Sequence, residues 1–341
     1  MNTTSGQEIA VIGAGSWGTA LAKLLAEKGY AVHLWAHRPE HAAAINRDHE
    51  NGKYLPGFSL PAGITAGSDL AEVVSGKGFV LMVVPSHVYR SVFSRVLAAL
   101  RDDALVVSAT KGIENESLMT MSQVMADELS RSGKKAAIGV LTGPSFAREV
   151  AAGMPAAVTV AAENKEVAAL IQTVFFTERL RVYTSTDLIG QELGAALKNI
   201  VAIAAGICDG LGYGTNTRAA LITRGLAEIT RLGVKMGANP LTFSGLGGLG
   251  DLVLTCTGDL SRNRTVGLKL GQGKKLTEIL AEMEMVAEGV KTTRSAWKLA
   301  QREGVDMPIL EQIHKVLYED KSCRDAVMSL LTRDQKQEME F

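Results

Sequence analysis

Hydrophobic and polar residues follow two different patterns along the 341-residue chain. In the first half, short apolar runs rich in β-branched residues alternate with helical patterns such as residues 19–28 and 87–100. The runs that predict strands are residues 10–12, 31–35, 79–84, 105–108, 137–141 and 157–160. Strands of a parallel sheet are covered on both faces and read as continuous apolar runs. This half therefore predicts a mostly parallel sheet covered by helices.

Near residue 187 the pattern changes to apolar residues three and four positions apart, which is typical of helices. Helical periodicity runs through residues 189–207, 218–236, 266–270, 276–284, 291–302 and 309–317. The chain is also too long for a single core of ordinary size. We therefore predict an α/β domain over residues 1–187 and an all-α domain over residues 188–341.

Composition and charge exclude several classes of protein. Lys and Arg together number 36, as do Asp and Glu, so the chain lacks the basic excess of a nucleic-acid-binding protein. The three cysteines, Cys208, Cys256 and Cys323, lie far apart and match no metal-site spacing. The polar N-terminus has no basic region of a signal peptide, and no uninterrupted apolar run approaches the ~20 residues of a membrane span. We expect a cytoplasmic protein with reduced thiols, without a metal, nucleic-acid or membrane partner.

The first predicted strand runs into the sequence Gly-Ala-Gly-Ser-Trp-Gly at residues 13–18. In this pattern Gly13 permits a tight turn, Gly15 lets the backbone approach a pyrophosphate, and Gly18 allows close packing of helix on strand. The N-terminus of the following helix presents N–H groups and a positive dipole end to a diphosphate. This strand–turn–helix context predicts that the α/β domain is Rossmann-like and binds a dinucleotide.

The end of the second strand bears on the choice of cofactor. An NAD-specific site usually places an acidic residue there to bind the ribose 2′-hydroxyl, and no acidic residue occurs in residues 34–38. His37 and Arg38 stand there instead, and a guanidinium suits a 2′-phosphate. The position favours NADP(H), with NAD(H) also usable. The alternative is that Arg38 is an ordinary surface arginine.

One lysine stands out on the first helix of the second half. A core stripe at helical spacing consists of Ile189, Leu193, Ala196, Ile200, Ile203 and Ile207. Lys198 lies on another face among small apolar residues, with Asn199 beside it. Desolvation there would lower the pKa of the lysine towards the range useful for acid–base catalysis. The alternative is a lysine whose long side chain reaches solvent at the helix end.

Four polar clusters interrupt apolar surroundings. Lys111 and the segment 143–145 follow predicted strands, and so fall near the sheet edge where ligands bind in doubly wound folds. The glycine-rich segment 245–250 ends at Asp251, and Ser261 is a candidate N-cap for a helix that begins with two arginines and an asparagine. Arginines beside a helix N-terminus suit a phosphate. Taken singly, each such cluster is more often a turn or a solvated cap than a ligand site.

Taken together, these segments resemble the bacterial type of NAD(P)-dependent sn-glycerol-3-phosphate dehydrogenase. The matching stretches, in chain order, are residues 13–22, 84–88, 110–114, 142–147, 194–207, 220–227, 245–257, 261–264 and 286–290. The resemblance implies an oxidoreductase that interconverts dihydroxyacetone phosphate and sn-glycerol 3-phosphate and so supplies phospholipid biosynthesis. It also implies a homodimer, with the substrate held between the Rossmann-like domain and the helical domain.

The resemblance assigns roles to individual residues. It implies that Lys198 is the catalytic residue. Implied substrate contacts are Lys111, Gly143, Ser145, Lys198, Asp251, Ser261, Arg262 and Asn263. Implied cofactor contacts, with the fingerprint glycines Gly13, Gly15 and Gly18, are Ser16, Trp17, His37, Arg38, Lys111, Ala147, Arg262, Val286 and Glu288.

A proton-transfer mechanism follows from these roles. An ammonium at Lys198 would stabilise the oxygen of a carbonyl under reduction and then supply its proton. Lys111 would lower the pKa of Lys198 by like-charge repulsion, while Asp251 would favour the charged lysine. Arg262 and Asn263 would hold the substrate phosphate. Two alternatives stay open: a ketopantoate-type reductase with the same domain layout, and a non-catalytic NADP-binding sensor.

Overall fold

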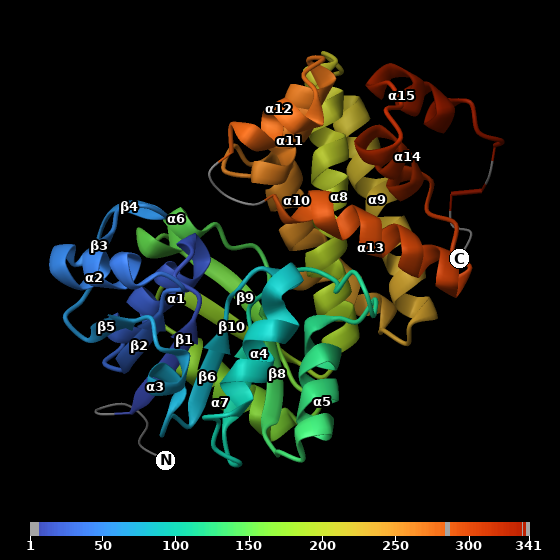
Figure 1. Ribbon diagram of the computed structural model, residues 1–341. Helices are drawn as coiled ribbons and strands as arrows, with labels where there is room; N and C mark the ends of the chain where they lie inside the picture. Colours follow the sequence, from blue (N-terminus) through green and yellow to red (C-terminus); the bar gives the residue numbers. More distant parts are fainter. Residues whose placement is uncertain (1–6, 284–286, 336, 339–341) are drawn as a thin grey trace. The chain divides into compact units, whose positions relative to one another are not determined.

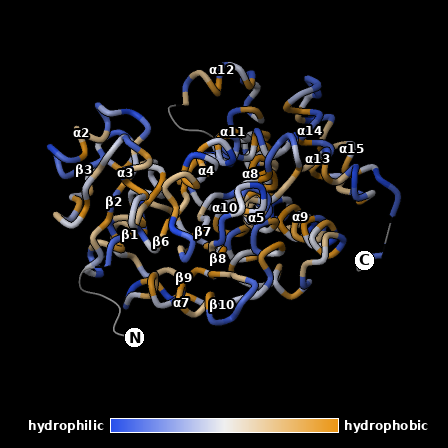
Figure 2. The backbone as a smooth tube through the Cα atoms, turned by 60° about the horizontal axis from the view of Figure 1, so that its bottom comes forward, coloured by the Kyte–Doolittle hydropathy of each residue, from blue (hydrophilic) through white to orange (hydrophobic). Residues whose placement is uncertain are grey.

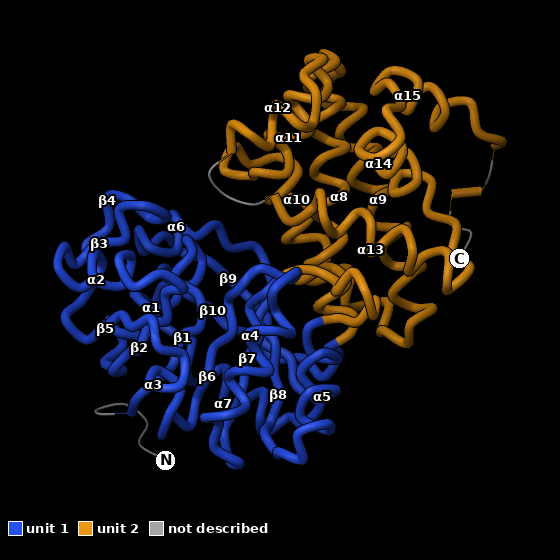
Figure 3. The backbone as a smooth tube through the Cα atoms, in the orientation of Figure 1, with its two compact units in different colours: residues 1–110, 121–188 blue, residues 111–120, 189–341 orange. Residues whose placement is uncertain are grey.

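The computed structural model describes residues 7–283, 287–335 and 337–338, and the chain forms two compact units (Figure 3). The first unit comprises residues 1–110 and 121–188, and the helical unit comprises residues 111–120 and 189–341. Residues 111–120 follow the strand at 105–108, yet they group with the helices rather than with the sheet. Each unit is therefore described by itself.

The first unit is built on an eight-stranded sheet in the order β10-β9-β8-β7-β6-β1-β2-β5 (Figure 1). Its strands are β1 (Glu8–Ile12), β2 (Ala31–Trp35), β5 (Ile64–Gly67), β6 (Phe79–Met82), β7 (Leu105–Ser108), β8 (Ala137–Thr142), β9 (Ala156–Ala161) and β10 (Leu180–Ser185). Neighbouring strands pair in parallel, except that β8 and β9 are antiparallel. The expected mostly parallel sheet is confirmed.

Helices and a small hairpin complete the first unit. The helices are α1 (Ser16–Glu27), α2 (Pro39–Asp48), α3 (Leu70–Val74), α4 (Tyr89–Leu97), α5 (Met121–Ser132), α6 (Ala147–Ala151) and α7 (Lys165–Phe175). Strands β3 (Glu50–Asn51) and β4 (Leu55–Ser59) form a separate antiparallel pair. The six predicted strands correspond to β1, β2 and β6–β9, while β5, β10 and the β3–β4 pair were not predicted.

The order in which the chain adds strands to the sheet reverses at β1, and this reversal determines where a ligand can bind. From β1 the chain adds β2 and β5 on one side, and then returns to place β6 on the other side of β1. Ligands of open α/β sheets bind at the carboxyl ends of strands beside such a switch point. The glycine-rich sequence at residues 13–18 directly follows the carboxyl end of β1.

The helical unit contains α-helices and two short irregular helices. The α-helices are α8 (Leu188–Gly210), α9 (Thr215–Lys235), α10 (Asp251–Thr257), α11 (Arg262–Gly271), α12 (Leu276–Ala281), α13 (Glu288–Glu303), α14 (Pro308–Tyr318) and α15 (Cys323–Leu331). A 3₁₀ helix, Pro240–Ser244, and a π-helix, Leu246–Gly250, lead into α10. The expected all-α character of this part of the chain is confirmed. Helices α10 and α15 were not predicted.

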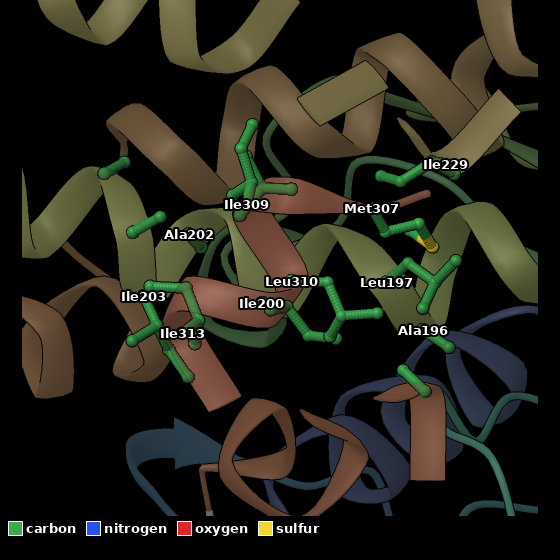
Figure 4. Close-up of a cluster of buried hydrophobic side chains, with 14 of the residues drawn as sticks. Ala196, Leu197, Ile200, Ala202, Ile203, Ile229, Met307, Ile309, Leu310 and Ile313 are labelled. Carbon is green, nitrogen blue, oxygen red and sulfur yellow. The ribbon is translucent and has the colours of Figure 1, made fainter. Parts of the chain in front are cut away.

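Helix α8 is the centre of the helical unit and is buried along most of its length. Figure 4 shows Leu197, Ile200 and Ile203 of α8 packed beside side chains of α9 and α14, including Ile229 and Leu310. Burial of such side chains stabilises a fold by about 1.5–3 kcal/mol each. In Figure 2, hydrophobic colours run through interior segments of both units and hydrophilic colours gather in the outer loops.

Among the described residues, α8 is the one helix that is long and apolar enough to cross a membrane by length and composition alone. Its most apolar window has a mean hydropathy of 1.4. Of that window, 89% is buried inside the structure. A core helix of a soluble protein meets the same criterion, and the packing of α8 accounts for its apolar character.

Candidate active site

A buried carboxylate pairs with a buried ammonium at the centre of the helical unit. Lys198 lies midway along α8 and is only 4% exposed, and Asp251, the first residue of α10, is fully buried. The Nζ of Lys198 donates a hydrogen bond to Oδ1 of Asp251 and another, of 2.8 Å, to Oγ1 of Thr255. The alternative in which Lys198 extends to solvent is wrong, because its side chain is enclosed on a helix that is buried all round.

A second lysine shares the same carboxylate. The Nζ of Lys111 lies 2.8 Å from Oδ2 of Asp251. Each oxygen of Asp251 therefore accepts from a different ammonium, and the two positive charges are held on either side of one negative charge. The segment 111–120 belongs to the helical unit, so this arrangement lies within one compact body.

The surroundings of Lys198 shift its protonation equilibrium. Burial lowers the pKa of Lys198 to about 7, because the ammonium loses hydration. Within that net value, the carboxylate of Asp251 raises the pKa and the nearby charge of Lys111 adds to the lowering. The opposing effects expected of Asp251 and Lys111 are both present. An amine with a pKa near neutrality can both donate and accept a proton under physiological conditions.

Glycines let the backbone that carries Asp251 approach α8. A Cβ on Gly194 would lie well inside contact distance of the Gly247 carbonyl oxygen, and a Cβ on Gly248 would collide with the backbone of Phe243. The π-helix therefore packs directly against α8, one turn before Lys198. Helix α10 begins where the π-helix ends. The close approach of the π-helix to α8 therefore directs Asp251, the first residue of α10, towards Lys198.

Thr255 fixes the lysine from a second direction. It lies four residues after Asp251, so both side chains occupy one face of α10. The Thr255 hydroxyl donates to the Asp251 backbone carbonyl at 2.6 Å, which leaves its lone pairs available to Lys198. Thr255 was not among the predicted site residues. The four-residue spacing of Asp251 and Thr255 indicates that they share a helix face only once α10 is known to be helical.

An amide chain runs from α8 to the starts of two other helices. Nδ2 of Asn263 donates to Oδ1 of Asn199 at 3.0 Å, and the Gly289 amide donates to Oδ1 of Asn263 at 2.9 Å. A Cβ on Gly289 would lie 2.7 Å from that oxygen, so only glycine fits there. The contacts fix the N-termini of α11 and α13 against α8 at Asn199, the residue after the lysine. The role of Gly289 was also missed by sequence reasoning.

The two arginines at the start of α11 have different environments. Arg264 pairs with Asp209 and Asp259, each at 2.9 Å, and so stabilises the fold. Arg262 is exposed, and within the described part of the chain its side chain makes no hydrogen bond or ion pair, although the charge of Glu288 attracts it. The Ser261 side chain caps α11 by accepting from the Arg264 amide at 3.2 Å, as expected. Of the two guanidiniums, that of Arg262 is therefore available to an anion.

In the first unit, the glycine-rich sequence forms a turn from β1 into α1. Gly13 has a φ of +126°, and a Cβ there would lie 2.7 Å from the Val83 carbonyl oxygen. A Cβ on Gly18 would collide with the Gly13 carbonyl. By contrast, a Cβ on Gly15 would meet nothing within 4 Å. The turn therefore excludes side chains at its base and leaves open space at Gly15, as a pyrophosphate requires.

The other predicted cofactor contacts of the first unit surround this turn. Ser16 is the first residue of α1, and the Nε1 of Trp17 is buried with no hydrogen-bond partner in the described part of the chain. Ala147 begins α6 and packs in the same apolar cluster as Trp17. His37 and Arg38 are exposed directly after β2. Ala147 therefore shares an apolar cluster with a residue of the turn, and its assignment as a cofactor contact stays a prediction.

The remaining assigned residues are placed as follows. Gly143 and Ser145 follow β8 in the first unit, and the Ser145 hydroxyl donates to the Gly143 carbonyl at 3.0 Å. Glu288 is the first residue of α13. Val286 lies outside the described residues. Among the described residues, no cluster of three His, Cys, Asp or Glu side chains could hold a metal ion.

Family models match the chain in two consecutive parts. The model for the N-terminus of NAD-dependent glycerol-3-phosphate dehydrogenase matches residues 8–168. The model for the C-terminus of the same enzyme matches residues 187–328. The two matches follow the α/β part and the helical part of the chain.

Individual proteins are similar over almost the whole length. Glycerol-3-phosphate dehydrogenase (NAD(P)+) of Geobacter metallireducens is 57% identical over 335 residues, covering 98% of this chain and 99% of the relative. The protein of the same name from Citrifermentans bemidjiense is 56% identical, covering 97% of this chain and 99% of the relative. A crystal structure of glycerol-3-phosphate dehydrogenase from Coxiella burnetii superposes with a TM-score of 0.92 at 41% identity, covering 96% and 99% of the two chains.

Proposed function

The chain belongs to the NAD-dependent glycerol-3-phosphate dehydrogenase family, and we propose that it interconverts dihydroxyacetone phosphate and sn-glycerol 3-phosphate with Lys198 as the proton donor and acceptor. The observation that carries this assignment is the Asp251 carboxylate shared by two lysines, one of them buried with a pKa near 7. A ketopantoate-type reductase and a sensor are both disfavoured by the names of the relatives at more than half identity.

The residues of the first unit fit a nicotinamide dinucleotide. Its pyrophosphate and neighbouring groups would be held in the open space at Gly15, by the N-terminus of α1 and by Nε1 of Trp17, which has no partner among the described residues. When bound, the nicotinamide supplies or accepts the hydride. The chain itself has to bind and orient the substrate and to manage one proton.

Lys198 manages that proton. In the reductive direction, its ammonium stabilises the carbonyl oxygen as negative charge develops there, and then transfers a proton from Nζ to that oxygen. In the oxidative direction the neutral amine takes the hydroxyl proton back. Asp251 and Thr255 together hold Nζ in one position.

The phosphate of the substrate is proposed to bind at the start of α11. Arg262 offers an exposed guanidinium there, and Asn263 and the N-terminal amides of the helix are adjacent in sequence. Lys111, Gly143 and Ser145 complete the proposed substrate contacts, and Glu288 and Val286 the proposed cofactor contacts. Binding energy from the distant phosphate then aligns the carbonyl for reaction.

NADP(H) is proposed as the preferred cofactor, with NAD(H) also used. His37 and Arg38 are exposed after β2, where an acidic residue would select NAD. Replacing Arg38 by Ala should raise the Kd of NADPH about tenfold, because a charge-assisted contact to the 2′-phosphate is lost. The Kd of NADH should stay within twofold. An equal effect on both cofactors would contradict a 2′-phosphate contact.

We extend the proposal to a cytoplasmic homodimer. The balanced charge of the chain and the exposed apolar residues Leu241 and Leu331 of the helical unit support it. Light scattering should give twice the 36.2 kDa mass of the chain. A mass that stays at the monomer value at micromolar concentration would contradict it.

The direct test of the activity is NADPH oxidation by the purified protein with dihydroxyacetone phosphate, with ketopantoate, and with neither. Turnover with dihydroxyacetone phosphate alone is the expected result. Turnover with ketopantoate would favour the other reductase class, and no turnover with either would favour a sensor.

A further inference from the structure

A single buried side chain connects the glycine-rich turn to the hairpin that follows α2. Asn51 lies at the end of β3 and is 1% exposed. Its Nδ2 donates to the Ala14 carbonyl oxygen at 2.9 Å and to Oγ1 of Thr19 at 2.8 Å. Ala14 lies between Gly13 and Gly15 of the glycine-rich sequence, and Thr19 is the fourth residue of α1.

The other end of the same amide is also fully used. Oδ1 of Asn51 accepts from Nε2 of His41 at 2.9 Å and from the Tyr54 amide at 3.2 Å. The Ala14 carbonyl can only accept and the Tyr54 amide can only donate, so the orientation of the Asn51 amide is fixed. No other uncharged side chain of this size supplies two donors and one doubly accepting oxygen.

The turn needs such an anchor because of its composition. Ala14 is flanked by Gly13, which has a positive φ, and by Gly15, around which a Cβ would find no neighbour. Glycines leave the backbone many accessible conformations. The hydrogen bond from Asn51 restrains the peptide between them, and a preorganised turn binds a ligand at a lower entropic cost.

We propose that Asn51 is a positioning residue for the dinucleotide: it holds the Ala14 carbonyl, and with it the amides of the glycine-rich turn, in the conformation that binds the pyrophosphate. This inference rests on the proposed function only in that the turn binds a dinucleotide. Asn51 itself touches neither cofactor nor substrate in this scheme. It also ties the turn to His41, which lies on α2 three residues after Arg38.

The test compares Asn51→Ala with a matched variant, Asn46→Ala. Asn46 also makes two hydrogen bonds, to the amide and carbonyl of Ala66, both at 2.8 Å, and it joins α2 to β5 without contacting the turn. The Kd values of NADPH and NADH are measured by calorimetry, and the thermal midpoint and saturated kcat are measured in parallel. Thr19→Val, which removes only one acceptor of Asn51 at constant shape, is the second variant in case Asn51→Ala does not fold.

We expect Asn51→Ala to raise the Kd of both cofactors about tenfold and by the same factor, because both contain the pyrophosphate. Saturated kcat should stay within twofold, and Thr19→Val should raise both Kd values about threefold. Asn46→Ala should lower the thermal midpoint but leave both Kd values within twofold. A rise of the NADPH Kd alone, or Kd values unchanged in Asn51→Ala and Thr19→Val, would overturn the inference. Failure of the unmodified protein to bind either cofactor would instead overturn the proposed function.

Discussion

Two glycine-rich segments of the chain serve different purposes. In the first, residues 13–18, the middle glycine borders open space and the segment leads into the N-terminus of α1. In the second, residues 245–250, the glycines are packed: Gly248 lies against Phe243, and Gly247 against Gly194 of α8. The first segment leaves space for a ligand, and the second removes space between two helices.

Glycine content alone therefore does not indicate a phosphate site. Around the second segment, close packing brings Asp251 to Lys198 and encloses both, and this enclosure lowers the pKa of the lysine. Around the first segment, the lack of a side chain at Gly15 leaves open space beside the backbone. One segment therefore serves acid–base chemistry and the other serves cofactor binding, and the two roles should respond separately to mutation.

Removing the lysine should have the largest effect and should leave the first segment intact. Lys198→Ala is expected to lower kcat about 10³-fold, within the range for loss of a general acid. The Kd of NADPH should stay within twofold, because the dinucleotide turn belongs to the other unit. Steady-state kinetics and calorimetry check this, with Lys198→Arg as a control that keeps the charge but cannot release a proton. Turnover within tenfold of the unmodified protein would contradict the acid–base role.

Filling the packed segment should damage both stability and catalysis. In Gly194→Ala the new methyl group meets the Gly247 carbonyl, so the π-helix has to shift and carry Asp251 with it. We expect a loss of about 1–3 kcal/mol in the free energy of unfolding, measured in urea, together with a fall in kcat. Unchanged stability and kcat would mean that this close approach is unimportant.

A side chain placed in the open segment should weaken cofactor binding and leave stability almost unchanged, and its overall effect should be smaller than that of Gly194→Ala. In Gly15→Ala the methyl group meets no protein atom within 4 Å, so stability should change by less than about 0.5 kcal/mol. The Kd of NADPH should rise about tenfold, because the methyl group occupies space that the pyrophosphate needs. Gly194→Ala is the matched control. A loss of stability in Gly15→Ala without a change in Kd would contradict the comparison.

Sequence periodicity predicted the buried strands but not the edges of the sheet. Strands β1 and β6 are covered on both faces and give continuous apolar runs. Strand β10 is an edge strand in which exposed Arg181 and Tyr183 alternate with buried residues, so its signal is alternation rather than a run. Helix α10 was missed because the glycines before it have low helix propensity and read as a turn.

The site was only partly predictable from the sequence. The position of Lys198 on an apolar helix was visible from periodicity, but its partners are remote: Asp251 is 53 residues away in sequence, and Lys111 lies 140 residues from Asp251. Local patterns carry no information about such pairings, and those assignments came from the family resemblance. Asn51 and Gly289 had no local signal, because their roles depend on segments that meet only in the folded chain.

The most direct test of the account is the pH dependence of kcat with and without Lys198. Reduction needs the ammonium, so kcat for dihydroxyacetone phosphate should fall as pH rises through about 7, the pKa of the buried lysine. Oxidation of sn-glycerol 3-phosphate needs the neutral amine, so its kcat should rise through the same region. The account predicts that both inflections disappear in Lys198→Ala. The same inflections at unchanged pH in that variant would show that another group handles the proton.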